Sequence, residues 1–105
     1  MIYNTSITVW KPQEDGRRVS WKRYVFLPAR LEATEGATAA ADGDQSARTA
    51  TLYMPHPIGA KLSRKDKVMP GVCGSPVPPS QALTVQTVAA LRIGRSAHHY
   101  ELTLA

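Results

Sequence analysis

The sequence predicts an all-β fold, a small antiparallel β-barrel or sandwich of about six strands with long loops. Two observations lead to this fold class. Several segments alternate side chains with period two, as strands do, and segments rich in Pro, Gly and Ser separate them. No stretch has the apolar spacing of a convincing amphipathic helix. Because single domains commonly contain about 100–150 residues, the 105-residue chain is expected to form one domain, residues 1–105.

The first two strands, residues 5–11 and 18–28, are expected to form a hairpin. Asp15 and Gly16 lie between them, and Asp-Gly is a preferred hairpin turn. In the second strand, Trp21 shares one side with other large apolar residues. The residues on this side are Val19, Trp21, Arg23, Val25 and Leu27. We expect this side to face the core and Trp21 to be buried.

The other strands follow at regular intervals. They are expected at residues 48–54, 66–72, 82–90 and 98–104. Residues 82–90 also fit a helix, but their Thr and Val residues favour a strand. Residues 33–47 contain small and acidic residues that bury too little surface to offset their ordering entropy, so we expect an exposed loop that is mobile or ordered only against a neighbouring subunit. In the last strand, Leu102 is expected to be buried.

Composition places the chain among globular proteins, with 43% apolar and 20% charged residues. The N-terminal residues lack the basic start and apolar run of a signal peptide, and no apolar stretch approaches the roughly 20 residues of a membrane span. Cys73 is the single cysteine of the sequence, so no internal disulfide can form, which fits a reducing compartment. We expect a soluble protein made in the cytoplasm.

Charge is distributed in blocks around a net value of +5. Residues 11–30 contain six basic and two acidic residues, a balance of +4, whereas residues 31–47 contain four acidic residues and no basic one. Residues 56–72 return to +3, with four basic residues and one acidic residue. Such blocks suit binding of nucleic acid or head-to-tail contacts between copies of the chain, and a solvated mixed-charge surface is an equally weighted alternative.

Catalytic and metal-binding patterns are absent from the sequence. The three histidines are His56, His98 and His99, and neighbouring residues on a strand point to opposite sides, so His98 and His99 are not expected to share an ion. Cys73 lies between glycines in “GVCGSP”, but no family pattern of a cysteine nucleophile surrounds it, and a partly buried structural cysteine is favoured. We therefore expect no enzyme, no cofactor and no metal. A hydrolytic enzyme that pairs Cys73 with a histidine is the weakest alternative.

Basic residues alternate with aromatic ones in “GRRVSWKRY”, and “SRKDK” adds a second basic cluster. Small β-barrels bind single-stranded nucleic acid on basic, aromatic surfaces. Because Trp21 is expected in the core, base stacking has weak support, whereas non-specific contact with phosphates is plausible.

Taken in order, the motifs resemble those of a family of tailed-bacteriophage proteins. These motifs are “ITVWKPQEDGRRVSWKRYVF”, a variable small-residue loop, “TATLYMP”, “KDKVMPGV”, “ALTVQTVAAL” and “HHYEL”. In this order they resemble the minor capsid, head–tail connector or head-closure (stopper) proteins. The resemblance spans nearly the full length, although Lys67 and Pro70 alter the usual Asp–hydrophobic–Gly turn and Tyr100 stands where the family has tryptophan.

The resemblance implies a non-enzymatic β-barrel subunit of a homo-oligomeric ring, a dodecamer, in the virion neck between head and tail. Portal, adaptor and tail-terminator proteins would be its partners, with packaged double-stranded DNA held non-specifically and no membrane involved. A small basic nucleic-acid-binding module, or a tail-terminator or adaptor protein of the same neck, are the alternatives.

Site residues follow from the resemblance and the charge blocks together. The segment from His56 to Lys65 is long for a hairpin loop and basic, so Lys61, Arg64 and Lys65 are the candidates for facing a DNA-filled channel. The candidates for contacts between subunits carry opposite charges or begin the last strand. They are Glu32, Glu35, Asp42, Asp44, Arg17, Arg18, His99 and Tyr100.

Overall fold

The computed structural model describes residues 2–35, 48–94 and 96–105. These residues form six strands and one short 3-10 helix. The elements are β1 (Thr5–Asp15), β2 (Arg18–Glu35), β3 (Arg48–Pro55), η2 (Ile58–Lys61), β4 (Lys67–Pro70), β5 (Leu83–Ile93) and β6 (Ser96–Leu104). The predicted all-β fold is confirmed, and each predicted strand has a counterpart. The predicted loop at residues 33–47 begins too early, because β2 continues to Glu35, and residues 36–47 lie outside the described part of the chain.

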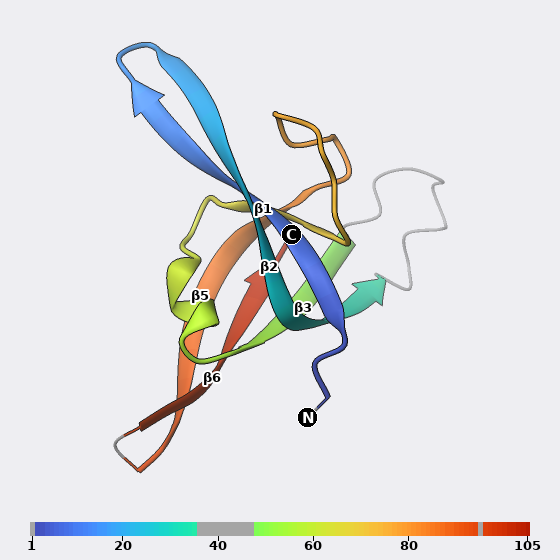
Figure 1. Cartoon of the computed structure of the whole chain (residues 1–105), viewed down its shortest axis with the longest axis vertical. Helices are drawn as coiled ribbons and strands as arrows, with labels where there is room; N and C mark the ends of the chain where they lie inside the picture. The colour runs from blue at the N-terminus through green and yellow to red at the C-terminus, as the bar shows by residue number, and fades with distance from the viewer. Residues whose placement is uncertain (1, 36–47, 95) are drawn as a thin grey trace.

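The strands close into a barrel in the order β1-β2-β3-β6-β5-β4, and β4 pairs back with β1 (Figure 1). Each of these pairings is antiparallel. The last strand, β6, lies between β3 and β5, so both of its edges are hydrogen-bonded to strands of the same subunit.

The barrel interior is filled by alternating apolar side chains, as the sequence pattern predicts. Leu102 is fully buried, as expected, and its register partner on β3 is the equally buried Leu52. Strand β1 contributes Ile7 and Val9 to the same cluster, while Leu62, from the segment after η2, covers part of it. The core therefore contains residues from each of the six described strands.

Trp21 does not belong to this core, so the predicted inward side of β2 is wrong. Trp21 is half-buried, and on the same side of the strand Val19 is 57% exposed. Ile7 and Val9 determine which side faces inward, and their register partners on β2 are Phe26 and Tyr24. Directly opposed residues of an antiparallel pair share a side, so the side that contains Trp21 points outward.

A register shift then exchanges the two sides of β2. Ile7 pairs with Phe26 and Thr5 pairs with Ala29, so three steps along β2 match two along β1. Such a bulge moves the inward positions by one residue, which is why Ala29 is fully buried although Phe26 also contacts the core. The alternation read from the sequence contains no sign of this shift.

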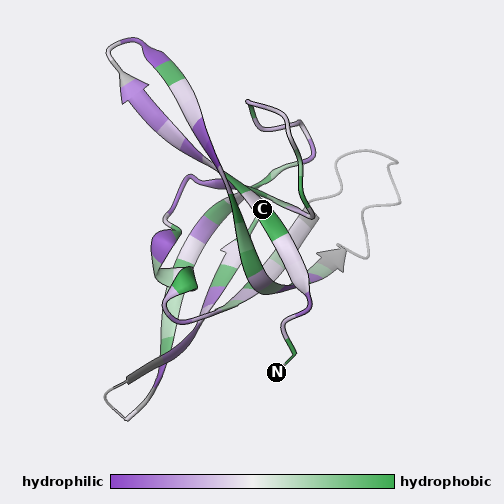
Figure 2. Ribbon diagram, in the orientation of Figure 1, coloured by the Kyte–Doolittle hydropathy of each residue, from purple (hydrophilic) through white to green (hydrophobic). Residues whose placement is uncertain are grey.

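Two hairpins extend beyond the barrel in opposite directions (Figure 1). The first consists of the distal halves of β1 and β2, joined by a two-residue turn whose first residue, Gly16, has a φ of +65°. The second consists of the distal halves of β5 and β6. The distal part of the first hairpin is largely hydrophilic, interrupted by an apolar band on β2 (Figure 2). In the first hairpin, residues 11–22 pair with no other described strand, whereas in the second β3 still pairs with β6 as far as His99.

Candidate nucleic-acid interface

The three residues predicted to face DNA lie on the segment between β3 and β4. Lys61 is the last residue of η2, and Arg64 and Lys65 occupy the centre of a turn in which the N–H of Asp66 donates to the carbonyl of Ser63 over 3.2 Å. All three basic side chains are exposed. Among the described residues, none of them makes a side-chain hydrogen bond or ion pair.

Asp66 fixes this turn to the barrel from the inside. Its residue exposure is only 1%. The Nζ of Lys11 donates to its Oδ2 over 2.6 Å, and the backbone N–H of Ser63 donates to the same oxygen over 2.9 Å. The charge of a buried carboxylate needs such partners, since an unpaired buried charge is strongly unfavourable. The only acidic residue of “SRKDK” thus holds the basic residues around it in place.

Backbone hydrogen bonds attach the turn to β5. The N–H of Lys65 donates to the carbonyl of Val85 over 3.1 Å, and the N–H of Val85 donates to the carbonyl of Asp66 over 2.8 Å. Lys65 has a φ of +77°, in the left-handed region that non-glycine residues rarely adopt. The hydrogen bonds to Val85 therefore hold Lys65 in a backbone conformation that is unfavourable for a residue with a side chain.

The first half of the segment packs on Tyr100, in the middle of β6. A Cβ on buried Gly59 would lie 2.5 Å from Cδ1 of Tyr100, so only glycine allows η2 to approach so closely. On the other side, the ring of His56 stacks on Tyr100, and His56 Nδ1 lies 3.2 Å from the Tyr100 hydroxyl oxygen. Residues 56–66 therefore form a ledge that is attached to the barrel through β5 and β6, and Lys61, Arg64 and Lys65 are exposed on it.

A second irregular segment, residues 71–82, is held by side chains of β1. The Trp10 Nε1–H donates to the carbonyl of Ser75 over 2.9 Å. The Thr8 hydroxyl donates to the carbonyl of Gly71 over 2.8 Å and accepts the N–H of Cys73 over 2.9 Å. Trp10 and Thr8 are both fully buried on the outer side of β1 beneath this segment. Trp10, and not Trp21, is therefore the fully buried tryptophan.

Cys73 is a free thiol, half-buried as expected. Its carbonyl accepts a hydrogen bond from Nη1 of Arg23 over 3.2 Å, so its backbone is part of the anchored segment. Side chains of β1 and β2 thus hold the backbone of Cys73 in place.

The residues predicted to contact other subunits are spread over the molecule. Arg17 and Arg18 are exposed at the tip of the β1–β2 hairpin. Glu32 is exposed on β2 and accepts a hydrogen bond from Nε of Arg30 over 3.1 Å. Tyr100 packs against the core of its own subunit, and both Tyr100 and His99 are half-buried. Of the rest, Glu35 ends β2, whereas Asp42 and Asp44 lie outside the described residues.

His98 and His99 do not point away from each other as expected. Their Nδ1 atoms lie 2.9 Å apart, and the two rings meet edge to face. A structural zinc ion usually has four ligands, so these two imidazoles alone would not complete such a site. In the described part of the chain, no group of three or more His, Cys, Asp and Glu residues is placed to hold a metal ion.

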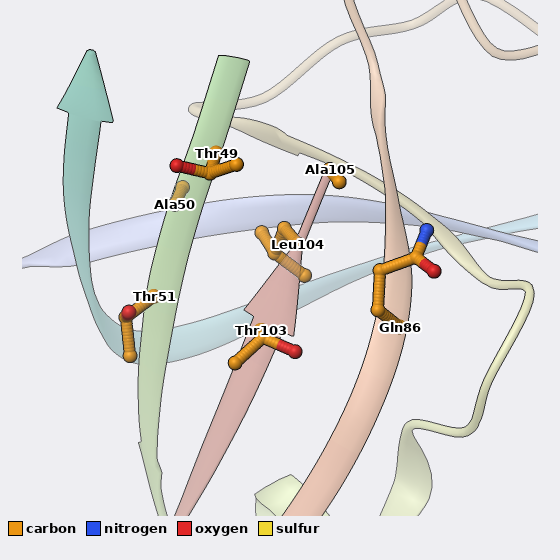
Figure 3. Close-up of a pocket in the computed structure, with 7 residues that line it drawn as sticks. All are labelled: Thr49, Ala50, Thr51, Gln86, Thr103, Leu104 and Ala105. Atoms are coloured by element: carbon orange, nitrogen blue, oxygen red, sulfur yellow. The ribbon is translucent and has the colours of Figure 1, made fainter. Parts of the chain in front are cut away.

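Strands β3, β5 and β6 and the C-terminal residue line an open hollow of about 360 Å³ (Figure 3). Its lining consists of uncharged side chains from these strands. The residues are Thr49, Ala50, Thr51, Gln86, Thr103, Leu104 and Ala105. No lining side chain is ionisable near neutral pH, so this hollow offers no side chain for acid–base chemistry.

No family model, curated protein or solved structure matches the chain. Within the described residues, no helix has the length and apolar character needed to cross a membrane. The arrangement of the side chains is thus the basis for a functional assignment.

Proposed function

We propose that the chain is a structural, non-enzymatic subunit of a bacteriophage head–tail connector ring, of the head-closure or stopper type. The ring would lie in the virion neck, join the portal to the tail and help to retain packaged double-stranded DNA. The proposal begins from the order of the sequence motifs and draws its structural support from the two hairpins that extend beyond the barrel.

The observation that carries the proposal is the set of large apolar side chains exposed on the two strands that extend beyond the barrel. Val19, Val25 and Leu27 are exposed on β2, with Val19 on the free hairpin and the other two on the barrel wall, and Val88 and Leu91 are exposed on β5. Exposed apolar surface of this kind marks interaction sites where it is contiguous. A subunit with one such hairpin at each end of a compact barrel suits head-to-tail contacts, and contacts of this kind form rings when the rotation between copies closes.

Charge supports the same arrangement. The tip of the β1–β2 hairpin is basic through Arg17 and Arg18, whereas exposed Glu32 lies on the part of β2 that pairs with β3. Opposite charges on separate parts of one subunit favour one relative orientation of neighbours. The portal, adaptor and tail-terminator proteins would contact the two faces of the ring.

Retention of DNA would depend on the ledge. Lys61, Arg64 and Lys65 are exposed cations on a backbone that is hydrogen-bonded to the barrel. Cations held in this way attract phosphates of any sequence, because such contacts do not read bases.

Assembly is tested with the full chain by analytical ultracentrifugation and negative-stain electron microscopy over a range of concentrations. We expect ring-shaped oligomers, and we expect the double variant Val19→Ser, Leu27→Ser to remain monomeric and folded. Val72→Ser removes an even more exposed valine from the segment after β4 and is the matched control, which should still assemble. A chain that stays monomeric, and whose gene has no portal, capsid or tail genes beside it, would contradict the proposal.

DNA retention is tested in assembled particles with Lys61, Arg64 and Lys65 replaced together by serine. Packaged DNA should be lost while rings persist, whereas Arg92→Ser, which removes an exposed cation from β5, should have no effect. Particles that keep their DNA with the triple variant would show that the ledge does not hold it. Immunogold labelling then places the subunit, since an adaptor or tail terminator would occupy a different level of the neck.

One observation favours the alternative of a free nucleic-acid-binding module. The rings of Tyr24 and Phe26 stack with centroids 5.9 Å apart, and Tyr24 is exposed beside the basic residues Lys22 and Arg23. An exposed aromatic ring among cations is suited to stacking on an unpaired base. A monomer that prefers single-stranded over duplex DNA would support this alternative.

A further inference from the structure

The β1–β2 hairpin is a free ribbon from Lys11 outward. The pairing of β1 with β4 ends at Trp10, and the pairing of β2 with β3 begins at Arg30. Residues 11–22, which we call the arm, therefore pair only with each other and extend from one end of the barrel (Figure 1).

The register divides the arm into two sides. Lys11 pairs with Lys22, so their side chains share one side, while Pro12 and Trp21 share the other. Because Nζ of Lys11 bonds to Asp66, the side that holds Lys22 faces the turn between Ser63 and Asp66. Lys22 thus lies on the side of the arm that faces the turn with Arg64 and Lys65, one strand further from that turn than Lys11.

The charges on this side are largely unneutralised. Lys11 is paired with Asp66, but within the described residues Lys22, Arg64 and Lys65 have no ion pair, and all three are exposed. The exposed acidic side chain of Glu14 lies on the opposite side of the arm, since its register partner is Val19. Toward the tip, Arg18 is opposite Asp15 in the register and Arg17 lies in the turn, so Lys22 is the cation without an ion pair on this side of the arm that lies nearest to the barrel.

We propose that the arm and the ledge form one phosphate-binding surface for duplex DNA, with Lys22 as the contact that joins them. A row of separate cations matches an anion that repeats along a line, and the DNA backbone has this form. The direction of the surface follows the arm, so DNA would lie along β1 and β2 on the Lys22 side. The choice of DNA rests on the proposed function, whereas the cationic surface rests on the register and the ion pairs.

Binding is measured with the full chain by fluorescence anisotropy of a labelled duplex, at a series of salt concentrations beginning at low ionic strength. Each phosphate contact contributes about 0.9 to the slope of log K against log salt. Lys22→Ser should lower affinity and reduce the slope by about 0.9, and Arg64→Ser combined with Lys65→Ser should reduce it by about twice as much. Duplexes of unrelated sequence should bind equally well.

Arg92→Ser is the control, because it removes one exposed cation from the hairpin at the opposite end of the barrel. Circular dichroism and thermal unfolding check that each variant keeps its fold. An unchanged slope in Lys22→Ser, an equal loss in Arg92→Ser, or binding to polyglutamate with none to DNA would overturn the inference. Ring formation is measured separately and without DNA, so failure of this inference and failure of the connector proposal give different results.

Discussion

Lys11 and Asp66 are separated by 55 residues in the sequence, yet Nζ of Lys11 lies 2.6 Å from Oδ2 of Asp66 at the edge of the barrel. The lysine joins β1 to the turn that carries Arg64 and Lys65. Asp66 is the more deeply buried partner, with 2% of its side chain exposed against 22% for Lys11. Removing the lysine would therefore destabilise the fold mainly because the buried Asp66 carboxylate would lose its cation.

Lys11→Met keeps the aliphatic stem but leaves Asp66 without its cation. We expect the free energy of unfolding to fall by about 1–3 kcal/mol, because the buried carboxylate keeps its contacts with Ser63 but loses charge compensation. Urea denaturation measures the change. The matched control is Arg30→Met, which breaks an exposed ion pair with Glu32 and should cost less than about 1 kcal/mol. Equal costs for the two variants would contradict a special role for the Lys11–Asp66 pair.

Gly59→Ala should destabilise the protein by about 1–3 kcal/mol, because the added methyl group overlaps the Tyr100 ring. Thermal unfolding measures the effect. Gly74→Ala adds the same group where no atom lies within 4 Å, so its midpoint should be close to that of the parent chain. A harmless Gly59→Ala would mean that η2 can move away from β6 without cost.

Trp10→Ala should cost about 3–5 kcal/mol, since it removes a fully buried side chain together with the bond to the Ser75 carbonyl. Trp21→Ala should cost less than half as much, because Trp21 is half-buried and outside the core. Urea denaturation of the two variants gives both values. The reverse order would restore the sequence-based expectation that Trp21 is the core residue.

Lys65→Gly should raise the free energy of unfolding by about 0.5–1 kcal/mol. Its φ of +77° costs a residue with a Cβ about 1–2 kcal/mol, and the greater freedom of glycine in the unfolded chain offsets part of the gain. Arg64→Gly, at the neighbouring turn position, brings that entropy cost without relieving a positive φ and should destabilise. Denaturation curves that rank the two variants the other way round would exclude strain at Lys65.

Local patterns predicted the strands and the first hairpin, but neither the order of the strands in the barrel nor which side of β2 faces inward. Alternation in β2 is real, yet Val19, Trp21 and Leu27 form the outward side, because Ile7 and Val9 of the partner strand decide the orientation and a bulge near Ala29 reverses it. The basic residues of the ledge were visible as a charge cluster. Asp66 was visible only as the exception within that cluster, since its partner is distant in sequence and becomes a neighbour only through the pairing of β1 with β4.

The different surroundings of the two tryptophans give the protein two distinct optical reporters. Trp10 is fully buried with its indole N–H hydrogen-bonded, so its emission follows the integrity of the barrel. Trp21 is partly accessible on the arm, so its emission and its quenching by a soluble quencher follow whatever covers that hairpin. In a Trp21→Phe variant the remaining signal reports folding alone. The difference between this signal and that of the parent chain isolates the arm, which allows its docking to be timed without an added label.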